Sequence, residues 1–139
     1  MSARSVAFQV YGVAQPKGSA KAYVSRGASP RAIVTTDNPK SKSWTLLVAA
    51  GAQSAAVDGM LDGPLSLAVT FWLPRPASVR RYDPTTRPDV DKLARCVLDA
   101  LTGVLYADDS HVVELYARKR YALVGGSPHV SVTLAEIPV

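Results

Sequence analysis

Residues 87–109 combine an amphipathic helix with a dense group of aspartates, and this segment limits both the fold and the chemistry of the chain. In the helix predicted for residues 89–102, Leu93, Val97 and Leu101 recur at helical spacing and form one apolar stripe. A helix with one such stripe must bury it against another layer of structure. Five of the eleven acidic residues lie in this segment: Asp89, Asp91, Asp99, Asp108 and Asp109. Carboxylates this close repel one another, so their grouping predicts a bound cation.

The rest of the chain is basic. Sixteen Lys and Arg residues against eleven Asp and Glu give a formal net charge of +5, and the pI is near 9.6. Such a balance favours an anionic polymer as the partner, and nucleic acid is the commonest. The alternative is a basic domain whose charge serves solubility alone.

Length and cysteine content narrow the class of protein. A chain of 139 residues suits one domain, 1–139, with a real core. The single cysteine excludes an internal disulfide, and with only two histidines a zinc cage is not expected. The N-terminal residues lack the apolar core of a signal peptide, and no apolar run is long enough to cross a membrane. We therefore expect a cytoplasmic protein without a membrane partner.

The pattern along the chain predicts one α+β domain in the order β-β-α-β-α-β-β, with a mixed sheet of four to five strands and two main helices. Strands are expected at residues 4–12, 31–36, 65–73 and 111–121 and around 130–134, and helices at 37–57 and 89–102. Residues 13–30 and 74–88 are expected to be loops, and 104–106 a short extended piece. On the fourth strand, Val113, Leu115 and Ala117 are expected to share a face, and Trp44 and Trp72 are assigned to the core.

The aspartates have structural explanations as well as a functional one. Asp89 and Asp91 can cap the helix and complement its dipole. Asp108 and Asp109 follow the helix, so they cannot cap its start, but Ala-Asp-Asp-Ser is typical of a turn. If the four instead share an ion, Mg²⁺ or Mn²⁺ is the expected one, because such ions take a few carboxylate oxygens and leave positions for water and phosphate.

Two cations on the helix accompany these acids. Arg95 lies one turn after Asp91, and Lys92 lies beside it. Either can stabilise charge on a phosphate during cleavage. Arg95 can equally form a surface ion pair with Asp91 or Asp99, and the two roles are compatible.

The run from Asp89 to Val113 resembles the signature of the RusA-type Holliday junction resolvases of phages and prophages. That signature is Asp-x-Asp-Asn-x-x-Lys, then Asp-Ala-Leu, then Asp-Asp-x-x-Val. Here it reads Asp89-Val-Asp91-Lys92-Leu-Ala-Arg95, then Asp99-Ala-Leu, then Asp108-Asp109-Ser-His-Val-Val. The match is strong over residues 84–116, and the loop Gln15-Pro-Lys-Gly is similar to the family's basic loop more weakly.

The resemblance implies a magnesium-dependent homodimeric endonuclease that cuts four-way DNA junctions by paired symmetric nicks, in recombination, repair or phage DNA processing. It implies Asp89, Asp91 and Asp109 as catalytic metal ligands, with Asp108 adjacent. Lys92 stands where the family usually has Asn, and Arg95 stands where it has Lys. Arg95 can contact a phosphate but cannot act as a lysine proton donor, so the departure affects the order of steps more than the reaction class.

Basic residues outside the helix are predicted to hold the DNA backbone without reading sequence, although each run can instead be a solvated face. They are Lys17, Lys21, Arg26, Arg31, Arg75, Arg80, Arg81, Arg87, Arg118, Lys119 and Arg120. Tyr82 can stack on an unpaired base at a junction or lie on the surface without a role.

Three classes of function compete. The first is the metal-dependent junction nuclease. The second is a branched-DNA-binding protein of the same fold whose nuclease centre has decayed, with Lys92 and Arg95 as the signs of decay. The third is a nuclease of the Pro-Asp…Glu-x-Lys type, which Pro88-Asp89 fits but Glu114-Leu-Tyr does not, since it lacks the lysine.

Overall fold

The computed structural model describes residues 3–18, 20–24, 32–36, 40–56 and 58–138, with the backbone alone for 20–24 and 32–36. In this part of the chain the order of elements is β1 (Ser5–Tyr11), β2 (Ala20–Val24), β3 (Ala32–Thr36), α1 (Lys40–Ala55), β4 (Leu65–Leu73), α2 (Val90–Leu101), the 3-10 turn η1 (Asp109–His111), β5 (Val112–Tyr121) and β6 (His129–Glu136). The α+β class is confirmed, and the observed order adds one strand to the predicted one.

Four strands form a mixed sheet in the order β1-β6-β4-β5. β4 is central, pairing antiparallel with β6 and parallel with β5. The parallel pair requires a crossover between the two strands, and the chain from β4 through α2 to β5 supplies it. Residues that alternate along β4 are buried at Leu65, Leu67, Val69, Phe71 and Leu73.

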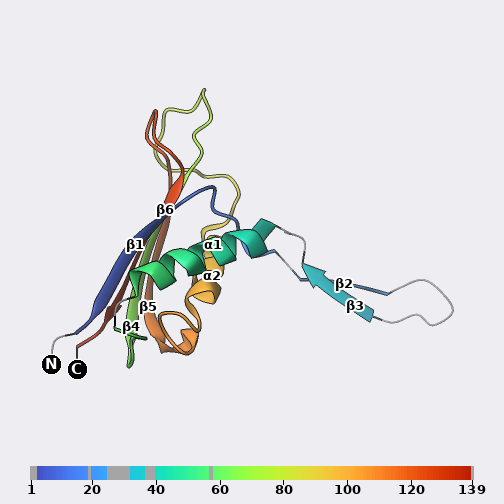
Figure 1. The fold of residues 1–139 in the computed structure, drawn as a ribbon. Coiled ribbons are helices and arrows are strands. Elements are labelled where there is room, and N and C mark those ends of the chain that lie inside the picture. The colour runs from blue at the N-terminus through green and yellow to red at the C-terminus, as the bar shows by residue number, and fades with distance from the viewer. Residues whose placement is uncertain (1–2, 19, 25–31, 37–39, 57, 139) are drawn as a thin grey trace.

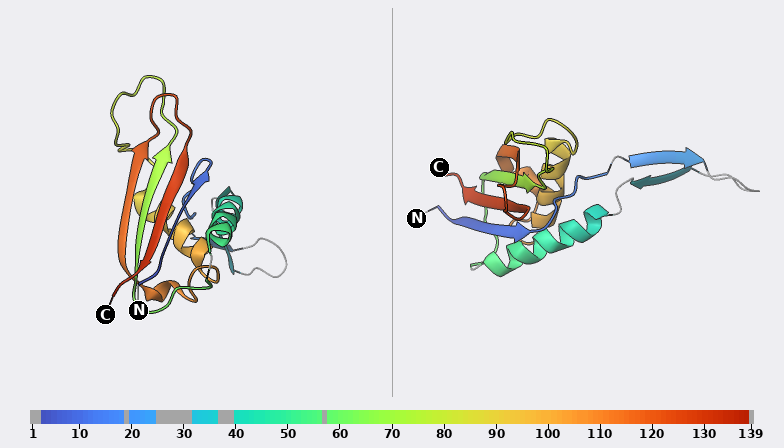
Figure 2. Two further views of the ribbon diagram at one scale, coloured as in Figure 1. Left: turned by 60° about the vertical axis from the view of Figure 1, so that its left-hand side comes forward. Right: turned by 90° about the horizontal axis from the view of Figure 1, so that it is seen from above.

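Both helices lie on one face of this sheet, where α1 packs against β1 and α2 (Figures 1 and 2). The predicted stripe of α2 is buried there together with Trp44, Val48 and Ala52 of α1. In the described chain no helix covers the opposite face of the sheet (Figure 2). We call this the open face.

The strand β2 was not predicted, because residues 13–30 were assigned to a loop. Ala20–Val24 pairs antiparallel with β3 and forms a separate two-stranded sheet. Alanine and lysine have weak strand propensity, so this strand depends on backbone pairing with a partner that its own sequence does not reveal. This two-stranded sheet projects away from the main sheet (Figure 1). The cap predicted at 37–39 lies outside the described residues.

Leu115 and Ala117 lie on one face of β5 as predicted, beside Leu67 and Val69 of β4. Val113 and Leu115 are nevertheless 61% and 46% exposed, because β5 is an edge strand that α2 covers only in part. Two further predictions were wrong in detail. Residues 104–106 form a turn rather than an extended piece, although Gly103 has the predicted left-handed conformation, with φ of 83°. Trp44 is buried as predicted, but Trp72 lies half-buried on the open face.

Candidate active site and basic surface

Asp89 opens α2, but its carboxylate is not used as a cap. The backbone of Asp89 has the extended conformation of an N-cap residue, and its side chain makes no capping hydrogen bond. Its side chain is 54% exposed, with the Lys92 ammonium 4.0 Å from Oδ2. The capping explanation therefore holds for the position of Asp89 and not for its side chain, whose oxygens remain accessible to a ligand.

The turn after α2 brings the second aspartate pair back along the helix. Tyr106 is fully buried, and its hydroxyl donates a hydrogen bond to the Leu98 carbonyl at 2.8 Å. Burial raises the pKa of this hydroxyl well above its ordinary value, so it stays a donor. The Gly103 amide also donates to the Tyr106 carbonyl, at 2.7 Å. These contacts fold residues 102–106 tightly, so that Asp109 lies beside the middle of α2.

Arg95, in the middle of α2, contacts two aspartates of the motif. Its Nη1 lies 2.9 Å from Oδ2 of Asp109 and 3.9 Å from Oδ1 of Asp99. The ammonium of Lys17 reaches the other Asp99 oxygen at 3.0 Å. The predicted helical pair of Arg95 with Asp99 is thus present but longer than the pair with Asp109, which the sequence did not predict.

Asp108 has a structural role that its neighbour lacks. Its Oδ1 accepts a hydrogen bond from the Ser110 amide at 3.0 Å and caps η1. This backbone hydrogen bond lowers the pKa of Asp108 below its ordinary value. The turn explanation is therefore confirmed for Asp108, while Asp109 points its carboxylate at Arg95.

The donor set suits a hard divalent ion by its chemistry, since Asp89, Asp91 and Asp109 offer only carboxylate oxygens. The arrangement is less complete: among the residues that the structure describes, no three His, Cys, Asp or Glu side chains are grouped to hold an ion. Asp109 instead holds the Arg95 guanidinium. Any ion bound through Asp109 would have to take that carboxylate from Arg95.

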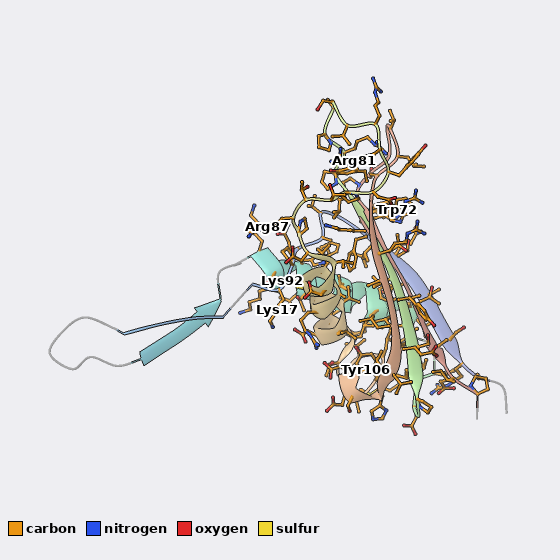
Figure 3. All side chains as sticks on the ribbon, turned by 180° about the vertical axis from the view of Figure 1, so that it is seen from behind. Lys17, Trp72, Arg81, Arg87, Lys92 and Tyr106 are labelled. Atoms are coloured by element: carbon orange, nitrogen blue, oxygen red, sulfur yellow. The ribbon has the colours of Figure 1, made fainter. Side chains whose placement is uncertain are left out.

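Two clefts flank the start of α2. A cleft of about 600 Å³ is lined by Lys17, Arg87, Asp89 and Lys92, among others. A second, of about 350 Å³, is lined by Lys17, Asp91, Lys92 and Arg95 and reaches Leu115 of β5. Figure 3 shows Lys17, Lys92 and Arg87 together near the start of α2, with Tyr106 beyond its other end. The aspartates thus lie among cations that can meet an anionic substrate.

Two contacts of Lys17, one through its backbone and one through its side chain, fix its loop to α2. The Lys17 amide donates to the Lys92 carbonyl at 2.9 Å, while its side chain runs on to Asp99. No sequence pattern predicted this contact, because residues 17 and 99 are far apart in the chain and only the fold brings them together.

The basic residues predicted to hold DNA fall into three groups. Those exposed on the surface are Lys17, Arg80, Arg81, Arg87 and Arg118. Those that are half-buried and contact other groups of the protein are Arg75, Lys119 and Arg120. Arg26, Arg31 and the side chain of Lys21 lie outside the described residues.

The half-buried group supports the loop 74–88. The guanidinium of Arg75 donates to the carbonyls of Ala122, Val79 and Arg81. The ammonium of Lys119 donates to the carbonyls of Thr86 and Pro88, at 2.6 and 2.8 Å. Lys119 therefore fixes the chain just before Asp89, a positioning role that charge alone did not indicate.

Glu114 does not join the aspartates. Its carboxylate accepts a hydrogen bond from the Tyr116 hydroxyl at 3.0 Å. Residues 114, 116, 118 and 120 alternate with those facing α2, and Arg120 packs over Trp72 on the open face. Glu114 therefore points away from the aspartates, which argues against the third class of nuclease.

Neither helix of the described chain has both the length and the apolar character needed to span a bilayer.

Comparison with known proteins identifies the family of the chain. The chain is 31% identical over 144 residues to the uncharacterized protein YqaN of Bacillus subtilis (strain 168), a match that covers 95% of this chain and 96% of that protein. A sequence model of the family described as endodeoxyribonuclease RusA matches residues 14–135. That span runs from the Lys17 loop through α2 and Asp109 into β6, so the chain belongs to the RusA endodeoxyribonuclease family.

Proposed function

We propose that this protein is a Mg²⁺-dependent endonuclease that resolves four-way DNA junctions and related branched DNA by paired symmetric nicks in recombination, repair or phage DNA processing. The main support is the contact of Arg95 with Asp109, at 2.9 Å. This contact holds the aspartate that follows α2 against the helix that Asp89 and Asp91 begin. Family membership supports the reaction class, and cations line the same clefts as Asp89 and Asp91.

The proposed ligands of Mg²⁺, or of Mn²⁺ in its place, are Asp89, Asp91 and Asp109, with Asp108 adjacent. A bound ion of this kind supplies a hydroxide nucleophile and neutralises charge on the attacked phosphate. In this scheme Arg95 leaves Asp109 and turns to the phosphate, where its guanidinium can form two hydrogen bonds. Lys92, 4.0 Å from Asp89, is the second cation proposed to contact the same phosphate.

The exposed cations Arg80, Arg81, Arg87 and Arg118 are proposed to hold the DNA backbone, with Lys17 beside the cleaved strand. Two matched nicks in a two-fold symmetric junction favour a protein with the same symmetry, so we propose a homodimer. We propose the cytoplasm as its location, in a bacterium or an infected host.

The runner-up is a branched-DNA-binding protein of the same fold without nuclease activity. The observation that favours it is that Arg95 already neutralises Asp109, as a bound ion otherwise would. All three proposed ligand aspartates are nevertheless present, and a decayed centre has no need of them.

Cleavage of a synthetic four-way junction decides between the two. We expect symmetric nicks in Mg²⁺ or Mn²⁺, no nicks in EDTA, and no cleavage of a linear duplex of the same sequence. Tight junction binding without nicking in either metal would support the runner-up, and cleavage in EDTA would contradict the proposed metal.

A further inference from the structure

Four side chains form a single row across one end of the open face, one from each strand of the main sheet. The strand register places Tyr11 opposite His129, His129 opposite Trp72, and Trp72 opposite Arg120. The ring centroids of Tyr11 and His129 are 5.0 Å apart with planes tilted by 33°, and those of His129 and Trp72 are 5.7 Å apart with planes 18° from parallel. The Arg120 guanidinium lies 5.8 Å from the centroid of the Trp72 ring. The row is therefore continuous, with one stacked ring pair and one tilted pair.

The two ends of the row differ. At β5, Arg120 also packs over Tyr82 at 5.2 Å, and its Nε lies 3.6 Å from Asp83, so the loop 74–88 closes this end. At the other end Tyr11 lies on the edge strand β1 and is 61% exposed. In the described part of the chain no further ring stacks on Tyr11, so the exposed side of this ring can meet a ring brought by a ligand.

A cleft of about 410 Å³ lies against this row. Tyr11, Trp72 and His129 line it on the sheet side, and Leu123 and Ser127 of the turn between β5 and β6 line it on the other. The His129 ring is held by a hydrogen bond from Nδ1 to the Ser127 carbonyl, at 2.9 Å. An aromatic cleft with few polar groups suits a flat, polar ring.

Two polar side chains in the same cleft can recognise the edge of such a ring. The Gln9 amide donates to the Ser131 hydroxyl at 3.3 Å, and both side chains line the cleft. Between them they offer donors and acceptors of the kind that bases use.

The charge around the row indicates what the flat ring is attached to. Arg118 is exposed and, two residues before Arg120, lies on the same face of β5. Arg81 is exposed in the loop that closes the row. Figure 3 shows Arg81 above Trp72, near the top of the view. An apolar protein surface would not be complemented by these cations, whereas a phosphodiester strand would.

The row and the candidate active site lie on opposite faces of the sheet, near the same end. Arg120, in the row, and Lys119, its neighbour, point to opposite faces of β5. Lys119 donates to the Pro88 carbonyl and so holds the residue just before Asp89. Val13, two residues after Tyr11, lines the same cleft as Asp89, so the Tyr11 end of the row also lies near a strand bound at Asp89.

We propose that this cleft takes an unpaired nucleobase of the bound DNA, which stacks on Tyr11 and extends the row. The inference rests on the proposed function for the identity of the polymer. It adds a contact to a base, which the phosphate-binding cations do not make.

Short single strands test the site without requiring cleavage. Binding of an oligothymidylate is compared with binding of an abasic strand of the same length, which keeps the phosphates and lacks the bases. We expect Tyr11→Ala to weaken oligothymidylate binding about ten-fold and to leave abasic binding unchanged, while Tyr11→Phe retains wild-type affinity. Tyr116→Ala is the matched control, because Tyr116 is also 61% exposed on the open face but lies outside the row.

Three results would overturn the inference: equal affinity of the wild-type protein for the two strands, equal effects of Tyr11→Ala and Tyr116→Ala, or a change in sedimentation of Tyr11→Ala without DNA. The last would mean that the face joins two copies of the chain. Junction cleavage by the wild-type protein separates this failure from failure of the proposed function. Nicking with no effect of Tyr11→Ala contradicts only the base site, and base-dependent binding without nicking contradicts only the nuclease.

Discussion

Nη1 of Arg95 lies 2.9 Å from Oδ2 of Asp109, so a cation of the protein occupies a carboxylate proposed to bind a metal ion. Both side chains are partly exposed, at 49% and 36%. Solvent screening keeps such pairs weak, at about 0.2–1 kcal/mol. The pair can therefore be displaced by a divalent ion, and its cost to metal affinity is small.

Replacing Arg95 should strengthen metal binding while weakening catalysis. Arg95→Gln removes the competing cation, so we expect Mn²⁺ to bind about two- to five-fold more tightly, the factor that corresponds to a weak surface pair. Calorimetric titration with Mn²⁺ measures it, with Arg118→Gln as the control for loss of one positive charge. Equal affinities for the two variants would show that Arg95 does not compete with the ion.

Asp91→Asn should abolish junction cleavage and leave junction binding intact or tighter. The variant loses a proposed metal ligand and also a negative charge that repels phosphate. Gel shift in EDTA and cleavage in Mg²⁺ separate the two effects. Asp58→Asn, an exposed aspartate outside α2 and η1, is the control for charge. Nicking by Asp91→Asn at the wild-type rate would exclude Asp91 from the site.

Tyr106→Phe should lower the free energy of unfolding by about 1 kcal/mol, since a buried hydroxyl loses its hydrogen bond to the Leu98 carbonyl. The loss is limited because Thr102 Oγ1 also donates to that carbonyl, at 2.9 Å. Urea denaturation measures the change. Tyr116→Phe, which removes an exposed hydroxyl, should change stability little. Equal effects would mean that the anchor of the 102–106 turn is not the Tyr106 hydroxyl.

Gly51→Ala should destabilise the protein, although alanine favours a helix over glycine by about 1 kcal/mol. A Cβ at this position would lie 2.6 Å from Cγ2 of Val10, at the contact between α1 and β1. We expect the clash to outweigh the propensity and to lower the free energy of unfolding by about 1–2 kcal/mol. Ser54→Ala, at an exposed position of the same helix, should be neutral or slightly stabilising. A stabilised Gly51→Ala would disprove the close packing.

Glu136 should stabilise the fold at neutral pH and stop doing so in acid. The backbone N–H groups of Arg4 and Asp62 donate to its carboxylate at 2.9 and 3.1 Å. They lower its pKa in the folded protein below the ordinary value of 4.5. The unfolded chain then binds the proton more readily, so the contribution is present above about pH 4.5 and is lost as the pH falls through the folded pKa.

The measurement is the difference in Tm between wild type and Glu136→Gln across this range. We expect the wild type to melt higher at pH 7 and the difference to shrink below the ordinary pKa of the carboxyl. A difference that stays constant with pH would show that the carboxylate charge does not matter.

The sequence was sufficient to predict those elements whose residue pattern is periodic within a single segment. Alternation along residues 65–73 predicted β4 with its bounds, and helical spacing predicted α2 to within a residue at each end. The aspartate motif identified the family, because its residue types and spacing are local properties of the chain. These signals need no partner, since each segment carries its own periodicity.

The tertiary structure decided everything that depends on a second segment. Pairing fixed β2, the position of β5 as an exposed edge, and the assignment of Trp72 to the open face. The pair of Arg95 with Asp109, the anchoring of Lys119 before Asp89, and the row from Tyr11 to Arg120 all join residues that no periodicity relates. Such contacts arise because the sheet register and the buried turn at Tyr106 bring distant residues to contact distance, and only the whole core fixes that register.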